Sequence, residues 1–226
     1  LVAHATPSFD HGSCQNKNDT IRAAAAGLVS AEDTLFYSQI LLAGGLLVVL
    51  FGLANKLPFI IALIGTITLI SYENRLKALG MSGNIAVGFM SGAVFLFAGM
   101  VVNDPGPTLW MFGLAFFATI SREIIKDIQD LEGDKDRFTL PARIGISNSL
   151  ILAGAILITA VALSYTAAPQ FGGMALNAYL IGISAANIMM LIGFQNARNE
   201  NYFSGQKSIK QGMGIAMLAF IASAGL

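Results

Sequence analysis

Charge is scarce in this chain. Only 12% of its 226 residues are Asp, Glu, Lys or Arg, against about 25% in an ordinary soluble domain. The 13 basic and 13 acidic side chains cancel, so no excess of positive charge favours nucleic acid as a partner. Because 55% of the chain is hydrophobic and its mean hydropathy is +0.68, the composition is that of a membrane protein.

Cysteine and histidine are nearly absent as well. The single cysteine, Cys14, cannot form an internal disulfide. The two histidines, His4 and His11, lie near Cys14 and Asp10, but this spacing matches no common zinc pattern. We therefore expect no zinc site, and we also expect no signal peptide, low-complexity tract or soluble second domain.

Apolar segments make up most of the sequence. A helix needs roughly 20 apolar residues to cross a bilayer core about 30 Å thick. Seven segments approach that length, and small residues are frequent inside them, as is usual where helices pack in lipid. The sequence predicts an all-α, polytopic transmembrane bundle with spans at 35–54, 57–71 with an extension toward 75, 83–102, 109–125, 149–166, 174–194 and 209–225.

The loops between these segments alternate in charge. Lys56 is the one basic residue on one side, whereas twelve lie on the other. An excess of Lys and Arg marks the cytoplasmic side, so we expect a multi-pass cell-membrane protein whose functional face is cytoplasmic. The twelve are Lys17, Arg22, Arg75, Lys77, Arg122, Lys126, Lys135, Arg137, Arg143, Arg198, Lys207 and Lys210.

The first 30 residues differ from the rest of the chain, because they form neither a spanning segment nor an amphipathic helix. Ser30 and Asp33 have the spacing of a helix-capping pair, so the first helix should begin there. We divide the chain into residues 1–30, expected to be incomplete or poorly ordered, and a transmembrane bundle at 31–226.

One stretch, REIIKDIQDLEGDKDRFTLPARIG at 122–145, concentrates six acidic and five basic side chains in 24 residues. If the preceding helix continues to Asp130 or Asp134, then Asp127, Asp130 and Asp134 fall within an arc of roughly 60°, with Glu123 one turn earlier. Such a row can be a solvated helix end. The alternative is a cation site, for which Mg²⁺ is suitable because it binds through one or two carboxylates, water and phosphate oxygens.

Basic side chains flank these acids. Acids that hold Mg²⁺, together with Arg or Lys for phosphate oxygens, fit a diphosphate or a phosphate ester. The positive-inside rule would supply the same cations without any ligand, so both interpretations stay open. The flanking residues are Arg122, Lys126, Arg137 and Arg143, with Arg75 and Lys77 after Tyr72 at another helix end.

The stretch 122–145, with its core KDxxDxEGD, resembles the second aspartate-rich motif of the UbiA superfamily of intramembrane prenyltransferases. It is most similar to the archaeal branch that forms digeranylgeranylglyceryl phosphate. The stretch 72–84, YENRLKALGMSGN, resembles the family's Tyr and Lys segment and the Asn that follows it. RAAAAGLVS at 22–30 resembles the tail of the first aspartate-rich motif, with alanines where the family has prolines.

The resemblance implies a bundle of nine spans around a central cavity, with cytosolic helical caps that carry both acidic motifs. Two spans and most of the first motif are missing before Arg22. We therefore expect the sequence to be an incomplete record of a nine-span protein.

The resemblance also implies the site. Asp19, Asp127, Asp130 and Asp134 would bind Mg²⁺, and the last three would be catalytic. The metal would help diphosphate to leave, and the acceptor hydroxyl would then attack the allylic cation and form an ether. Arg22, Tyr72, Lys77, Asn84, Arg122 and Lys126 would bind the phosphate groups. Phe89, Phe95, Phe97, Phe116 and Phe117 could line an isoprenoid channel, although ordinary packing is the simpler explanation for any one of them.

The function that we expect is transfer of a geranylgeranyl group from its diphosphate to geranylgeranylglyceryl phosphate, an archaeal ether-lipid step with an isoprenyl diphosphate donor and a lipid phosphate acceptor. Two alternatives stay open: prenylation of an aromatic acceptor in a quinone pathway, and a cation-coupled membrane transporter. Membrane enzymes that transfer phospho-alcohols from CDP-linked donors also have clustered aspartates. Their signature places an Ala-Arg pair before the last two aspartates, whereas here Ala142 and Arg143 follow the acids. The sequence does not predict an oligomeric state.

Overall fold

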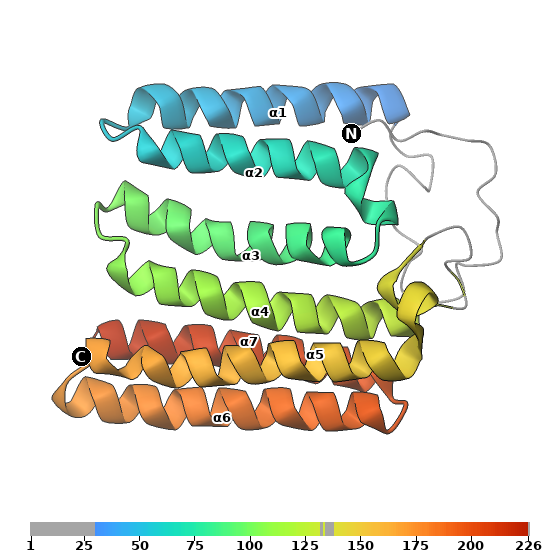
Figure 1. Cartoon of the computed structure of the whole chain (residues 1–226). Helices are drawn as coiled ribbons and strands as arrows, with labels where there is room; N and C mark the ends of the chain where they lie inside the picture. The colour runs from blue at the N-terminus through green and yellow to red at the C-terminus, as the bar shows by residue number, and fades with distance from the viewer. Residues whose placement is uncertain (1–29, 132, 134–137, 226) are drawn as a thin grey trace.

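A computed structural model describes residues 30–131, 133 and 138–225. In that part of the chain, seven α-helices lie side by side, with no strand (Figure 1). They are α1 (Ala31–Gly52), α2 (Leu57–Asn74), α3 (Met81–Val101), α4 (Gly106–Gln129), α5 (Leu140–Thr166), α6 (Gly173–Arg198) and α7 (Tyr202–Ala224), with short 3-10 turns η1 (Leu76–Ala78) and η2 (Ala168–Gln170).

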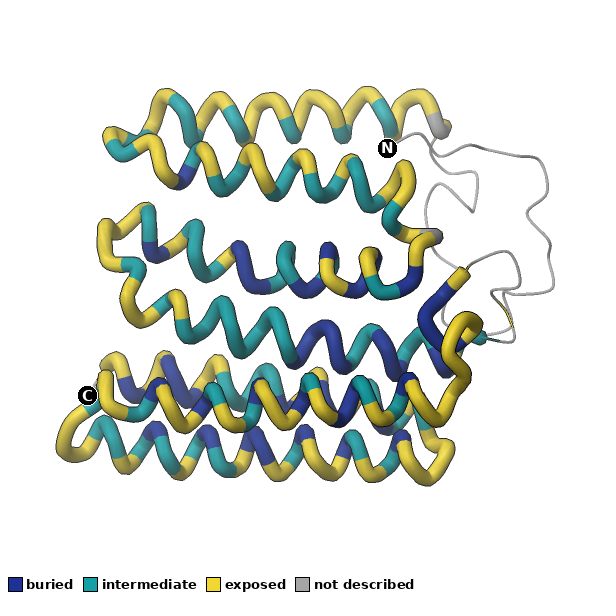
Figure 2. Tube along the Cα trace, viewed as in Figure 1, coloured by how far each residue is buried: buried dark blue, intermediate teal, exposed yellow. Residues whose placement is uncertain are grey.

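Length and composition suit these helices to a membrane. The six helices α1 to α6 are long and apolar enough to cross one. The outward faces of the bundle are largely exposed (Figure 2) and carry side chains such as Phe51, Ile67 and Ile181, which lipid would solvate. The predicted all-α transmembrane bundle is confirmed. The seventh predicted span corresponds to α7, which is long enough to cross at about 1.5 Å per residue but is not among the six helices that are also apolar enough.

Most of the predicted helix positions are confirmed, with some differences at the ends. Ser30 caps α1, since its Oγ accepts a hydrogen bond from the Asp33 N–H at 3.0 Å. The helix α4 ends at Gln129, with Asp130 as its cap, in agreement with the nearer of the two predicted ends, Asp130 and Asp134. The helices α5 and α7 begin before their predicted apolar segments. In α5 a short first turn from Leu140 is separated from the long helix by a kink at Gly145, and in α7 the first turns contain polar residues such as Gln206 and Lys207.

The core lies among α4, α5, α6 and α7. Ile124, Leu157, Ile183 and Ile209 are fully buried there, one on each helix. Beside this core, α3 packs closely on α4 through glycine. A Cβ at Gly92 would lie only 2.8 Å from the Phe112 carbonyl oxygen. Small residues allow such close helix contact in lipid.

The loops at one end of the bundle meet at Gly80, the residue before α3. Its φ is 61° and its ψ is −115°, a backbone conformation that is essentially restricted to glycine. A Cβ there would lie 2.9 Å from both the Leu140 nitrogen and the Phe138 oxygen. Gly80 therefore lets the loop between α2 and α3 contact the start of α5.

We expect Gly80→Ala to lower the thermal unfolding midpoint of the protein in detergent. Backbone strain alone costs about 1–3 kcal/mol, and the new Cβ also meets backbone atoms that cannot easily move. Gly44→Ala is the matched control, because a Cβ at Gly44 meets nothing within 4 Å and alanine is favoured in a helix interior. An unchanged midpoint for Gly80→Ala would contradict the contact between the loops.

Candidate functional site

Charged side chains gather at one end of the bundle, hereafter the charged end. This end contains the starts of α1, α3, α5 and α7 and the ends of α2, α4 and α6, on the right in Figure 1. Among residues 30–131, 133 and 138–225, only Lys56 and Asp104 are charged residues at the opposite end. The alternation of charge predicted from the loops is therefore a property of the fold.

At the charged end, Asn84 contacts Asp127. Asn84 lies in the first turns of α3 and is 6% exposed. Its Nδ2 donates a hydrogen bond to Asp127 Oδ2 at 2.9 Å. Two residues that the sequence assigned to different ligands, diphosphate and metal, thus form a pair across two helices. The amide fixes the orientation of the carboxylate.

Two ion pairs lie on the same end. Lys126 Nζ lies 3.4 Å from Asp130 Oδ2, and Lys77 Nζ lies 3.7 Å from Glu73 Oε2. All four side chains are about one third exposed or more, so neither pair contributes much to stability. Such pairs can open at little cost when a stronger ligand for the cation arrives.

Arg122 connects α4 to α7 rather than to the acids further along α4. Its guanidinium pairs with Glu123, and Nη2 donates to Gln206 Oε1 at 2.9 Å. Gln206 Nε2 in turn donates to Gln129 Oε1 at 3.3 Å. Arg122 Nε is buried and has no hydrogen-bond partner among the residues that the structure describes.

Sequence reasoning did not identify Gln206. The available signal was an amide side chain early in a helix whose later turns are apolar, but nothing local connects it to a residue 84 positions away. Glutamine carries no charge, so it is not part of the pattern of acidic and basic residues that indicated the site.

The predicted site residues are only partly brought together. Asn84, Asp127, Lys126 and Asp130 lie at the adjoining ends of α3 and α4. Tyr72 and Lys77 lie at the end of α2 and in η1, next to the start of α3. Asp19, Arg22 and Asp134 lie outside the described residues.

A cavity of about 630 Å³ lies between α2, α3 and α4, with Leu76 and Ser82 as its lining residues nearest the charged end. We call it the aromatic pocket. Phe89, Phe112, Phe116 and Phe117 line it deeper. The rings form a continuous series, with Phe112 and Phe116 stacked at 5.8 Å and Phe116 edge-on to Phe117 at 5.1 Å. Of the predicted channel residues, Phe89, Phe116 and Phe117 line this pocket, whereas Phe95 and Phe97 do not.

The residues present are compatible in chemistry with a magnesium ion. Within the described ranges, no group of three or more His, Cys, Asp or Glu side chains converges. Asp127 and Asp130 supply two carboxylates one helical turn apart, and Mg²⁺ is commonly bound by one or two carboxylates with water and substrate phosphates. The donor set is therefore hard oxygen, as this ion prefers.

Comparison with known proteins gives consistent matches over most of the chain. The model of the UbiA prenyltransferase family matches residues 13–225. The chain is 36% identical to digeranylgeranylglyceryl phosphate synthase of Methanothrix thermoacetophila, over 88% of this chain and 73% of that protein. It is 33% identical to the synthase of Methanococcus aeolicus, over 90% and 73%, and 32% identical to that of Haloquadratum walsbyi, over 90% and 71%.

A solved structure has the same fold. Its report concerns "the biosynthesis of Digeranylgeranylglyceryl phosphate synthase in membranes", and it matches with a TM-score of 0.74 at 31% identity. The match covers 92% of this chain and 75% of that one.

A double-mutant cycle tests the pairing of Asn84 and Asp127. We expect Asn84→Ala and Asp127→Ala to show a coupling free energy of about 1–2 kcal/mol in thermal or denaturant unfolding, because the hydrogen bond is charge-assisted and partly buried. A cycle between Asn84→Ala and Asp104→Ala, at the opposite end, should show no coupling. Equal coupling in the two cycles would mean that the contact does not exist in solution.

Proposed function

Because the chain belongs to the UbiA prenyltransferase family, we propose that it transfers a geranylgeranyl group from geranylgeranyl diphosphate to geranylgeranylglyceryl phosphate. The proposal is supported by the names of its relatives, which match most of this chain. Family membership sets aside the cation-coupled transporter. An aromatic acceptor remains the alternative that an experiment must exclude.

The observation that supports the proposal is that Asp127 and the aromatic pocket lie along the same pair of helices, α3 and α4, with Asp127 at the charged end. A carboxylate held by Asn84 lies at the charged end, and an apolar cavity continues from the same end toward the middle of the bundle. A prenyl diphosphate has the same arrangement of polarity, with an anionic head and a long apolar tail. The charged end holds the head while the pocket excludes water from the tail.

We further propose that Mg²⁺ binds at Asp127 and Asp130, with Asp19 and Asp134 as additional ligands. A bound Mg²⁺ would act as a Lewis acid toward the diphosphate and neutralise charge on it as the leaving group departs. Asn84 orients the Asp127 carboxylate. Lys77 and Lys126 can exchange their exposed carboxylate partners for phosphate oxygens, and Arg22 and Tyr72 complete the proposed phosphate-binding set.

The reaction breaks the bond between the prenyl carbon and the diphosphate oxygen, and the electron pair leaves with diphosphate. The acceptor hydroxyl oxygen forms a new bond to that carbon, so the products are an ether, diphosphate and a proton. The aromatic rings of Phe89, Phe116 and Phe117 suit the allylic cation, or the transition state close to it, because their faces attract positive charge without reacting. Exclusion of water prevents hydrolysis of the cation.

The charged end is proposed to face the cytoplasm, because it contains almost all the described Lys and Arg residues. This orientation would place the site on the side where soluble diphosphates and Mg²⁺ are available.

The proposed function predicts chelator-sensitive transfer in detergent or lipid. Labelled geranylgeranyl diphosphate and geranylgeranylglyceryl phosphate with Mg²⁺ should give a doubly prenylated lipid, and a chelator should abolish product until Mg²⁺ is restored. Transfer to an aromatic acid instead would agree with membership of the family but would reject geranylgeranylglyceryl phosphate as the acceptor. Undiminished transfer in the presence of the chelator would reject the proposed requirement for Mg²⁺.

The same assay includes a matched pair of variants. Asp130→Asn should lower turnover roughly 100-fold or more, since several kcal/mol of charge stabilisation are lost, with an unchanged unfolding midpoint. Asp104→Asn, at the opposite end, should retain full activity. Full activity in Asp130→Asn would make the acidic row a solvated helix end.

Orientation in the membrane predicts a labelling pattern. In a Cys14→Ser background, a cysteine at Asp104 should react with a membrane-impermeant thiol reagent on intact cells, and one at Arg198 should react only after lysis. Both positions are exposed at helix ends. The reverse pattern would place the charged end outside the cell.

A further inference from the structure

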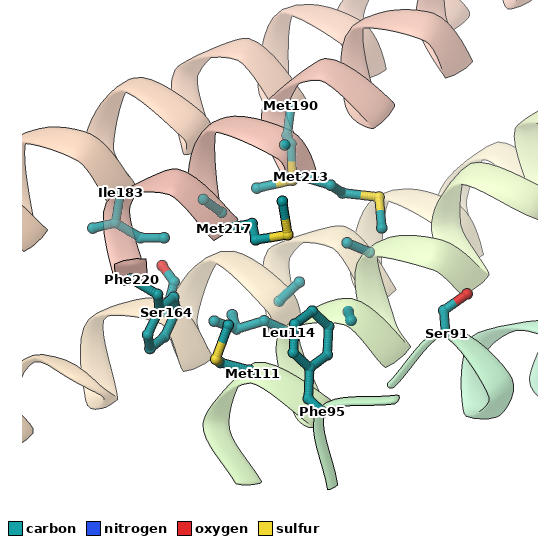
Figure 3. A pocket seen from close by; sticks show the side chains of 15 residues that line it. Ser91, Phe95, Met111, Leu114, Ser164, Ile183, Met190, Met213, Met217 and Phe220 are labelled. Atoms are coloured by element: carbon teal, nitrogen blue, oxygen red, sulfur yellow. The ribbon is translucent and has the colours of Figure 1, made fainter. Parts of the chain in front are cut away.

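A second cavity, of about 220 Å³, lies on the other side of α4. We call it the methionine pocket. Figure 3 shows Met111, Met190, Met213 and Met217, from three different helices, around one space, with Phe95 and Phe220 beside them. Methionine side chains are flexible and polarizable, which suits a branched ligand with several double bonds. The methionine pocket shares no lining residue with the aromatic pocket.

The two pockets use opposite faces of α4. Counted at about 100° per residue, the four α4 residues in the aromatic pocket span an arc of about 140°, and Asp127 falls near the middle of that arc. The four in the methionine pocket span about 100° on the opposite face, and Arg122 and Gln129 fall within that arc. These sets are Phe112, Gly113, Phe116 and Phe117, and Met111, Leu114, Ala115 and Ala118.

Each face of α4 therefore has its own polar group at the charged end. The aromatic pocket lies on the face of Asp127, which attracts cations. The methionine pocket lies on the face of Arg122, whose guanidinium pairs with Glu123 and Gln206 and whose buried Nε has no partner among the residues that the structure describes. An anionic group can accept a hydrogen bond from that nitrogen.

A stripe on α7 continues from this polar group into the methionine pocket. Gln206, which accepts a hydrogen bond from Arg122, is followed at intervals of one turn by Lys210, Gly214 and Met217. Lys210 is exposed, and none of the ion pairs within the described ranges includes it. It lies about 12 Å along α7 from the start of the helix.

We propose that Arg122, Gln206 and Lys210 bind the phosphate of the acceptor lipid while the methionine pocket binds part of its isoprenoid chain. The inference rests on the proposed function and adds a second lipid site to it. The diphosphate donor occupies the Asp127 face and the aromatic pocket, and the phosphate monoester occupies the Arg122 face. The helix α4 then separates the two chains, and their head groups meet at its end.

Recognition of the acceptor's phosphate and recognition of its isoprenoid chain are tested with separate variants, each by equilibrium binding and by kinetics. Lys210→Met should weaken equilibrium binding of radiolabelled geranylgeranylglyceryl phosphate about 10-fold or more, and raise its KM similarly, with the KM for the donor unchanged. Lys207→Met is the matched control, since Lys207 is also an exposed lysine of α7 but lies about 100° from Gln206 around the helix. With geranylgeranylglycerol, which lacks the phosphate, Lys210→Met and the unsubstituted protein should bind equally.

Gly214→Phe tests the pocket. Gly214 lines the pocket, and a Cβ there meets nothing within 4 Å, so a side chain can begin at this position without a clash. We expect about 10-fold weaker binding of the geranylgeranyl acceptor and little change for an acceptor with a two-carbon ether in its place. Gly45→Phe on α1, where a Cβ also meets nothing, should change neither.

Three results would overturn the second site: equal effects of Lys210→Met and Lys207→Met, a raised donor KM in Gly214→Phe, or displacement of the acceptor by equimolar phosphatidylglycerol. The last would show a general anionic-lipid site. Binding is measured without donor or metal, so it is independent of turnover. Absence of transfer in the unsubstituted protein, with acceptor binding intact, would reject the proposed function and not the site.

Discussion

Close contact between the backbones of α3 and α4 is the constraint on which the site depends. In lipid, burial of apolar surface does not drive helices together, so their mutual position is set by packing and hydrogen bonds. Gly88 and Gly92 allow α4 to approach α3 until a Cβ at either position would lie within 2.9 Å of an α4 carbonyl oxygen. This contact fixes the rotation and depth of both helices. One turn beyond Gly88, Asn84 then reaches Asp127.

Because of the same contact, α4 lies between the aromatic pocket and the methionine pocket. Because α3 covers one part of its surface and α5 and α7 cover others, the two remaining faces open into separate cavities. An enzyme that joins two anionic lipids has to hold two head groups that repel each other. In the proposed arrangement, the carboxylates would hold a metal on one face while Arg122 and Lys210 supply positive charge on the other. Such a separation would reduce competition between donor and acceptor for a single site.

Much of the fold could be predicted from the sequence because the membrane imposes a length on each helix. The apolar spans, the cap at Ser30 and the gathering of charge at one end all follow from local composition. The start of α5 did not follow, because the short turn that precedes the kink at Gly145, where φ is 80°, is too brief to show an apolar period. Asn84 and Asp127 were found as separate motif residues, and their contact depends on helix packing, which no local pattern records.

Lys210 shows why the second site was harder to predict. In the sequence it is one of twelve basic residues on one side, and the positive-inside rule accounts for all of them equally. Snorkelling toward the surface would also let a lysine remain at its depth on any face of α7. What distinguishes Lys210 is its angular position, because it shares a stripe with Gln206 and Gly214 while Lys207 does not. The positive-inside rule concerns only the number of charges on one side of the membrane, so it does not favour any face of α7. A bound phosphate, in contrast, requires the cation to lie on the face where the phosphate binds. The stripe therefore favours a ligand over topology as the reason for a cation at this position.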